Sequence, residues 1–324
     1  MSTLSECVDS FIENITVTDR QESSISQSVK NLNEHLKNKE AKMGVRRTFT
    51  AGSWERDTII RPLDDVDVFA VLDPAVWQDE YGQRSSPQSV LVSLKNYLNG
   101  LSDYEGKVTQ DRPCVTIQLS HKHIDVLPCF QETGRGYLMP SSDLKFWIFT
   151  DPELLEQELA TATTTCKFVK GIIKAVKHWK REHDISIPSF HAEEVTVAVS
   201  RVVTISDHAS GIKEWFKRAE IYLIKSKFNS GAAYDQAIKK VQQAKERLAK
   251  AEDHLRKDEQ DEALAIWKEL FGSVFKVLDL GEARSFSSAL REGTLRVAGP
   301  GVLSTAAGRA IPASSGYFGS TTNE

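Results

Sequence analysis

The clearest chemical signal in the sequence is a pair of aspartates, Asp65 and Asp67, at the start of an apolar segment. In a β-strand, side chains two positions apart share a face, so both carboxylates would lie on one face and Val66 and Val68 on the other. Two carboxylates this close repel each other unless a divalent cation lies between them, and oxygen ligands suit Mg²⁺ or Mn²⁺. The pair is therefore predicted to bind metal.

A third carboxylate supports the same prediction. Asp125 lies in the middle of the apolar segment HIDVLPCF, where an unpaired charge would be costly to bury. If this segment forms a strand beside the strand of Asp67, the three carboxylates converge. Such a trio can hold two metal ions, one acting on an attacking hydroxyl and one on a triphosphate. The alternative is that Asp65 belongs to a turn and Asp67 lies on a solvated strand edge.

Gly52 and Ser53 precede the aspartates and could contact such a triphosphate. A glycine allows the backbone to approach a ligand closely. A serine at this position offers its N–H and its hydroxyl to a phosphate oxygen. The combined pattern predicts a site for metal and nucleoside triphosphate.

The elements that position these residues follow from the spacing of apolar side chains. Within residues 20–42, four apolar residues at helical spacing predict an amphipathic helix: Ile25, Val29, Leu32 and Leu36. Alternating patterns predict strands at 47–54, 66–72, 114–119 and 123–130, with a helix at 90–101. From about residue 151 the sequence predicts mainly helices, and from residue 297 a flexible tail rich in small residues.

Composition excludes several classes of protein. The chain of 324 residues allows about two domains. Its formal net charge of −4 disfavours bulk attraction to nucleic acid or anionic lipid. We find neither a secretory signal nor an apolar stretch long enough to span a membrane, and the four cysteines are scattered as in a chain with free thiols. A cytoplasmic protein that does not contact the membrane is expected.

The ordered series of Gly-Ser, Asp-x-Asp and a third Asp resembles the DNA polymerase β-like nucleotidyltransferase superfamily. Its context resembles the bacterial cGAS/DncV-like branch of that superfamily, the CD-NTases. The resemblance covers about residues 10–275 and extends to the stretches HIDVLPCF, WIFTDPELLEQEL, KGIIKAVKHWKREHDISIPSFHAEEV and EALAIWKELFG. The sequence contains no P-loop, Rossmann fingerprint or GxSxG elbow, which argues against the corresponding enzyme classes.

The resemblance implies an α/β (α+β) fold, with a polymerase β-like nucleotidyltransferase core built on a mixed sheet and a helical C-terminal lobe. We expect the core to span residues 1–160, with the N-terminal helix packing on the second lobe. The helical substrate-binding lobe would span residues 161–285 and the flexible tail residues 286–324. The active site would lie in the cleft between core and lobe.

The resemblance also assigns roles to individual residues. The three aspartates, Asp65, Asp67 and Asp125, would be catalytic and would bind two Mg²⁺ or Mn²⁺ ions. Gly52, Ser53 and Lys170 would contact the triphosphate, and Ser189 would contact the nucleotide beside Phe190, an aromatic on which a base could stack.

The activity implied by the resemblance is the joining of nucleoside triphosphates, ATP among them, into a cyclic oligonucleotide second messenger with release of pyrophosphate. In the family this messenger serves antiphage (CBASS-type) signalling, which implies an effector and conjugating or regulatory proteins as partners, and no requirement for nucleic acid. Three alternatives stay open: a linear 2′–5′ oligoadenylate synthase, nucleotidyl transfer to a small molecule, RNA or protein, and a nucleic-acid sensor.

The residues themselves leave the roles of Lys170 and Phe190 open. Five basic residues follow helical spacing and form one stripe: Lys167, Lys170, Lys174, Lys177 and Arg181. A charged stripe is usually a solvated face, and the alternative is that Lys170 reaches a phosphate. Phe190 follows Pro188 and is either a core residue or a platform for a base.

Overall fold

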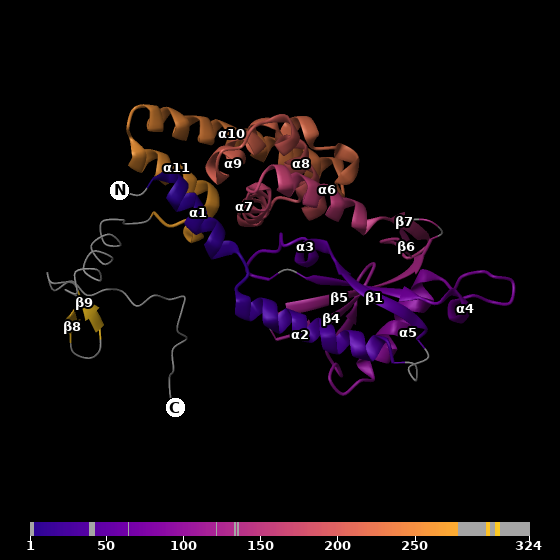
Figure 1. Cartoon of the computed structure of the whole chain (residues 1–324). Coiled ribbons are helices and arrows are strands. Elements are labelled where there is room, and N and C mark those ends of the chain that lie inside the picture. Colours follow the sequence, from indigo (N-terminus) through magenta and orange to yellow (C-terminus); the bar gives the residue numbers. More distant parts are fainter. Residues whose placement is uncertain are drawn as a thin grey trace.

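The computed structural model describes residues 3–38, 43–63, 65–120, 122–132, 134 and 136–277, with the backbone of 296–298 and 302–304. In Figure 1 a twisted sheet with two long helices against one face lies beside a bundle of helices. The helices α2 (Asp19–Leu36) and α5 (Pro87–Asn99) belong to the sheet part. The first helix of the chain, α1 (Leu4–Ile15), belongs to the bundle.

The sheet has seven strands and a mixed topology. Its strands are β1 (Val45–Ala51), β2 (Val66–Leu72), β3 (Val108–Gln110), β4 (Val115–Leu119), β5 (Lys122–Gln131), β6 (Tyr137–Pro140) and β7 (Trp147–Thr150). The order is β1-β2-β5-β4-β3, and β6 joins β5 to β7. The pair β2 and β5 is parallel, whereas every other pair is antiparallel. The predicted mixed sheet is confirmed.

The helices of the sheet part bury the face predicted from the sequence. The predicted apolar stripe of α2 is buried: Ile25, Val29, Leu32 and Leu36. It packs in one core with the fully buried residues of β2 and β5, which are Val66, Val68, Ile124 and Val126. Apolar burial of this kind is the main force that fixes a helix on a sheet. The opposite face of β2 carries Asp67, followed by Phe69 and Val71, which pack in a second, smaller apolar cluster.

The bundle contains α1 and the helices that follow the sheet. These are α6 (Pro152–Thr165), α7 (Val169–Glu182), α8 (Ser189–Val202), α9 (His208–Tyr222), α10 (Gly231–Arg256) and α11 (Gln260–Phe271). Their core is rich in buried aromatic side chains, including Trp179, Trp215 and Trp267. Phe11 of α1 packs against Phe271 with ring centroids 5.0 Å apart, so the N-terminal helix is an integral part of this core.

Two local predictions differ from the structure. The strand expected at 47–54 ends at Ala51, because Gly52 has a φ of +75° and starts the short helix α3 (Gly52–Glu55). The strands β6 and β7 were not predicted. The proposed boundaries at residues 160 and 285 stay a prediction. The predicted tail at 286–324 lies outside the described residues, apart from the backbone of β8 (Arg296–Ala298) and β9 (Val302–Ser304).

Within the part of the chain that the structure describes, no helix combines the length and the apolar character needed to cross a membrane.

Candidate active site

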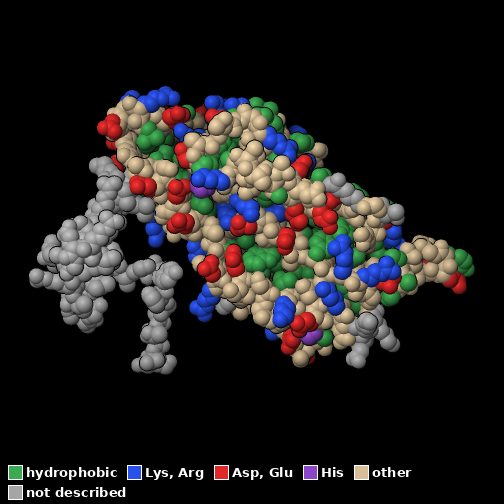
Figure 2. All heavy atoms as spheres, in the orientation of Figure 1, with side chains coloured by type: hydrophobic (Ala, Val, Ile, Leu, Met, Phe, Trp, Pro, Cys, Tyr) green, Lys and Arg blue, Asp and Glu red, His purple; other side chains and the backbone are tan. Residues whose placement is uncertain are grey.

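A cavity of about 930 Å³ lies between the sheet and the helices α6, α7 and α8. Its lining brings together the end of β1, the helix α3, the start of β2, the middle of β5 and the amino ends of α6 and α8. In Figure 2 acidic and basic side chains gather along the band where the bundle meets the sheet. The cavity therefore joins segments that are far apart in the sequence.

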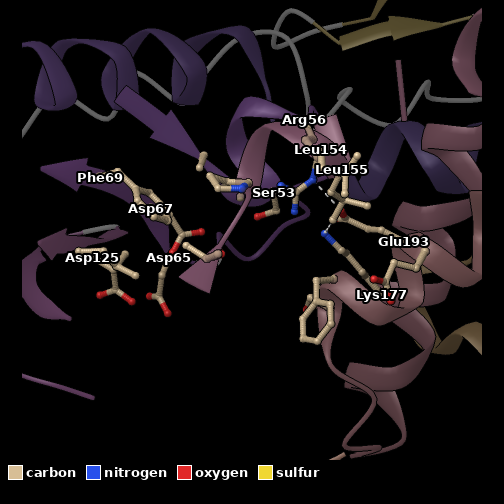
Figure 3. Close-up of a pocket in the computed structure, with 18 of the residues that line it drawn as sticks. Ser53, Arg56, Asp65, Asp67, Phe69, Asp125, Leu154, Leu155, Lys177 and Glu193 are labelled. Atoms are coloured by element: carbon tan, nitrogen blue, oxygen red, sulfur yellow. Dashed lines mark hydrogen bonds and ion pairs between the residues drawn. The ribbon is translucent and has the colours of Figure 1, made fainter. Parts of the chain in front are cut away.

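The three predicted aspartates line this one cavity. The parallel register places Asp67 directly opposite Asp125, and Val66 opposite Ile124. Because Val66 and Ile124 are buried on the helix-covered face, the alternation of the strands turns both carboxylates to the cavity. Asp65 precedes β2 and points toward the same space (Figure 3). The three aspartates therefore line one cavity, as expected if the two strands are neighbours.

Hydrogen bonds hold two of these carboxylates in place. The hydroxyl of Thr116, on β4, donates to Asp125 at 2.6 Å. Nδ1 of His123 lies 3.2 Å from a carboxylate oxygen of Asp65, and both side chains are about half exposed. The sheet therefore orients Asp65 and Asp125 through side chains on β4 and β5.

The carboxylates are difficult to ionise together in the absence of a cation. Burial, followed by the negative charge of Asp125, raises the pKa of Asp67 to about 7, against the lowering effect of Arg56. Burial also raises the pKa of Asp125, although the hydrogen bond from Thr116 opposes the change. Such a pair is a good ligand for a hard divalent cation, whose charge would compensate both groups.

A closed metal cage is nevertheless not present among the described residues, because no three His, Cys, Asp or Glu side chains are arranged to hold an ion. This fits the way Mg²⁺ is usually bound, by one or two carboxylates that are completed by substrate phosphates and water. The facing carboxylates of Asp67 and Asp125 are suited to that mode.

Gly52 allows the backbone of α3 to approach Asp67. A Cβ atom built at Gly52 would lie 1.9 Å from Oδ2 of Asp67, closer than any real contact. The turn that follows is compact, because the carbonyl of Ser53 accepts the N–H groups of Thr58 and Ile59 at 2.8 and 3.0 Å. Only glycine fits at position 52, which places Ser53 beside the carboxylates on the cavity wall.

The opposite wall of the cavity carries four basic side chains, beside the acidic Asp184, Glu193 and Glu194. Lys177 and Lys180 of α7 line it together with Arg56 and Arg181. The buried carboxylate of Glu193, on α8, accepts a hydrogen bond from Lys177 Nζ at 2.5 Å and from Arg56 Nε at 2.6 Å. Burial alone would raise the pKa of Glu193, but Lys177 and Arg56 together hold it below its ordinary value. Figure 3 shows these groups across the cavity from the aspartates.

Ser189 and Phe190 also line the cavity, at the amino end of α8. The hydroxyl of Ser189 accepts a hydrogen bond from Lys180 Nζ at 2.9 Å. The ring of Phe190 is 45% exposed, so it is not a core residue, and Lys227 Nζ lies 5.7 Å from the ring centroid. Of the two interpretations of Phe190, exposure favours the platform.

Lys170 lies on α7, outside the lining that the described residues give this cavity. Its ammonium lies 3.3 Å from Asp57. The basic stripe of α7 instead packs on the turn after α3: Lys174 pairs with Asp57 at 2.9 Å, and Arg181 donates to the carbonyl of Pro62 at 2.9 Å. Four members of the stripe thus contact the turn after α3: Lys170, Lys174, Lys177 and Arg181. The stripe forms the junction between bundle and sheet.

Comparison with known proteins gives a family. The sequence profile of the Second Messenger Oligonucleotide or Dinucleotide Synthetase domain matches residues 1–162, half of the chain. The chain belongs to this family of nucleotidyltransferases. It is therefore an enzyme that synthesises cyclic oligonucleotide messengers, as the resemblance to the CD-NTases predicted.

Relatives and solved structures agree with this family. The synthetase is 24% identical over 264 residues to a cyclic AMP-AMP-AMP synthase of Acinetobacter sp., over 70% of this chain and 72% of that protein. Its fold is similar to that of CdnC of E. coli MS115-1, solved with ATP (TM-score 0.67, 16% identity, 84% of this chain and 99% of that one). DncV of Vibrio cholerae, a cyclic AMP-GMP synthase, gives a TM-score of 0.64 at 15% identity, over 82% of this chain and 94% of that one.

Sequence reasoning did not single out several residues of the basic wall of the synthetase. Lys177 was seen only as a member of the stripe, and Arg56 and Glu193 were not singled out. A signal was available for Glu193, because a carboxylate on the apolar side of a helix, in HAEEVTVAV, needs a buried partner. The identity of that partner required the fold.

Gly52→Ala tests the contact between α3 and Asp67. We expect product formation by the synthetase to fall by at least about 100-fold, because the new Cβ displaces the Asp67 carboxylate by an ångström or more. Gly82→Ala is the matched control, since Gly82 also has a positive φ, +78°, but nothing lies within 4 Å of its Cβ position. Equal activity losses in the two variants would show that backbone strain, not the displacement of Asp67, is responsible.

The raised pKa of Asp67 predicts a pH-dependent stability of the metal-free protein. In the folded state the Asp67 carboxyl stays protonated up to about pH 7, whereas in the unfolded chain it loses its proton near pH 3.8. The contribution of Asp67 to the free energy of unfolding is therefore lost as the pH rises from about 3.8 to about 7. From pH 5 to 8 the free energy of unfolding should fall by about 3 kcal/mol more than in Asp67→Asn. Denaturant titrations in EDTA measure it. The same slope in both proteins would contradict the assignment.

Proposed function

We propose that the cavity between the sheet and the bundle is the active site in which the synthetase joins nucleoside triphosphates, ATP among them, into a cyclic oligonucleotide. The observation that carries this proposal is the register of β2 and β5, which turns Asp67 and Asp125 toward one space beside Asp65. Positive side chains lie across that space, as transfer of a negatively charged nucleotidyl group requires.

Asp65, Asp67 and Asp125 would hold divalent cations, Mg²⁺ or Mn²⁺, and we propose two ions by analogy with other paired-carboxylate sites. When bound, the cations would neutralise phosphate charge and lower the pKa of the attacking ribose hydroxyl. Thr116 keeps the Asp125 carboxylate aimed at the cavity. Of the three, we propose Asp125 as the group that accepts the hydroxyl proton, because in the family the third acid shares the metal on the side of the attacking hydroxyl.

The triphosphate of the donor would lie between α3 and the basic wall. The N–H and hydroxyl of Ser53 are suited to phosphate oxygens, and Gly52 leaves room for the approach. On the other side, Lys180 and Ser189 are already hydrogen-bonded to each other at the cavity surface. The half-exposed ring of Phe190 offers a face on which a base can stack. These contacts would hold the α-phosphate still for in-line attack.

The biological setting is proposed from the family. CdnC has been solved in complex with a HORMA protein, and we propose that this synthetase likewise has a regulatory protein partner. We further propose that it works in the cytoplasm in antiphage signalling, where an effector would read the messenger.

Incubation with all four ribonucleoside triphosphates and Mg²⁺ or Mn²⁺ tests the proposal directly. We expect a phosphatase-resistant oligonucleotide containing adenine, detected by liquid chromatography and mass spectrometry, and none from Asp65→Ala/Asp67→Ala. A product that phosphatase shortens would instead indicate a linear synthase. A product that survives in the double variant would contradict the assignment of the aspartates.

Two lysines of α7 separate the sequence-based assignment from the structural one. Lys180→Ala should raise the KM for ATP about tenfold, because a charge-assisted phosphate contact contributes on the order of 1.5 kcal/mol. Lys170→Ala should change it less than twofold, since Lys170 pairs with exposed Asp57 outside the cavity lining. Initial rates at varied ATP measure both. The reverse ranking would restore Lys170 as the triphosphate ligand.

A further inference from the structure

We propose that Glu193 is a positioning residue that holds Arg56 and Lys177 in the orientation that binds the donor triphosphate. This inference rests on the proposed function of the cavity. It concerns a residue of the bundle that touches no reacting atom and acts through two cations, one from each part of the molecule.

Glu193 is fully buried and uses both of its carboxylate oxygens. One oxygen accepts hydrogen bonds from Lys177 Nζ at 2.5 Å and from the hydroxyl of Thr58 at 2.7 Å. The other accepts from Arg56 Nε at 2.6 Å. The side chains of Lys177 and Arg56 are themselves only 2% and 8% exposed. The group is therefore withdrawn from solvent although Glu193, Lys177 and Arg56 all line the cavity.

The charges of Glu193, Arg56 and Lys177 favour the binding of an anion in the cavity. Two cations share one anion, so the cluster carries a net charge of about +1 toward a cavity that must receive a triphosphate. Without Glu193, the two buried like charges would repel each other and would lose the carboxylate to which both donate, which is costly in a protein interior. Glu193 thus allows two positive groups to occupy one wall.

The hydrogen-bond geometry gives the arrangement its precision. A guanidinium is a rigid plane with five N–H donors, and the bond from Nε to Glu193 fixes the direction in which the rest of that plane points. Arg56 follows α3 directly, and its backbone N–H donates to the carbonyl of Gly52 at 3.2 Å. Lys177 also donates to the carbonyl of Thr58 at 3.2 Å. One carboxylate therefore sets the register between α3, which carries Ser53, and α8, which begins at Ser189.

The test compares binding of two ligands that differ in their phosphates. We would titrate the full chain with α,β-methylene-ATP, which cannot release pyrophosphate, and with AMP, by calorimetry in Mg²⁺. Glu193→Gln should weaken binding of the triphosphate analogue by about tenfold or more and that of AMP by less than twofold. The reason is that an amide keeps an acceptor oxygen for only one of the two cations, turns an NH₂ group toward the other, and removes the negative charge to which both donate.

Control variants keep the result interpretable. Glu214→Gln is matched, since Glu214 also accepts from two cations, Lys217 at 3.3 Å and Arg218 at 2.8 Å, but lies on α9 away from the cavity lining. It should bind both ligands as the wild type does. If Glu193→Gln does not fold, Arg56→Gln is used, and the same selective loss is expected. In the double variant, loss of Glu193 should add little to loss of Arg56.

Three outcomes would overturn the inference. If Glu193→Gln loses the same affinity for the analogue and for AMP, Glu193 has a merely structural role. If the variant binds both ligands as the wild type does, Glu193 has no role in binding. Wild-type protein that binds neither ligand would overturn the proposed function itself, which the other two outcomes leave intact.

Discussion

The parallel pairing of β2 with β5 is the constraint on which the rest of the site depends. It sets Asp67 opposite Asp125, and it can do so only because the long segment between the two strands returns through α5 and the antiparallel strands β3 and β4. Parallel neighbours need such a crossover. The apolar residues of α2 then cover one face of the strands, which leaves the carboxylates nowhere to lie but in the cavity.

The electrostatics of the sheet explain why the helical bundle is required. Burial raises the pKa of both Asp67 and Asp125, and the charge of Asp125 raises that of Asp67 further, so the protein must supply positive charge if both are to be ionised near neutral pH. Positive charge must come from outside the strands. The structure supplies Lys177 from α7 and Arg56 from the turn after α3, and it buries both against Glu193. The active site therefore combines the carboxylates of the sheet with cations from both parts of the molecule.

Local periodicity made much of this predictable. The buried stripe of α2, the alternation around Asp67 and the isolated charge of Asp125 each specify an environment within a few residues, and the resemblance to a family placed them in one fold. The contacts between side chains of the sheet part and those of the bundle could not be predicted from local periodicity. The basic stripe of α7 has the same spacing whether it faces solvent, phosphate or protein, and only the fold shows that Lys170 meets Asp57. The strand predicted at 47–54 failed because no local pattern reveals the positive φ of Gly52.

The segment between the Gly-Ser and Asp-x-Asp motifs connects these observations. It contacts three helices of the bundle: Ile60 pairs with Thr16 at the end of α1, Thr58 donates to Glu193 of α8, and Pro62 accepts from Arg181 of α7. A shift of the bundle would pull on this turn, and the turn is joined to α3 on one side and to Asp65 on the other. Triphosphate contacts and metal ligands would then move together. The short distance between the two motifs in the sequence is thus what couples the position of the bundle to the geometry of the carboxylates.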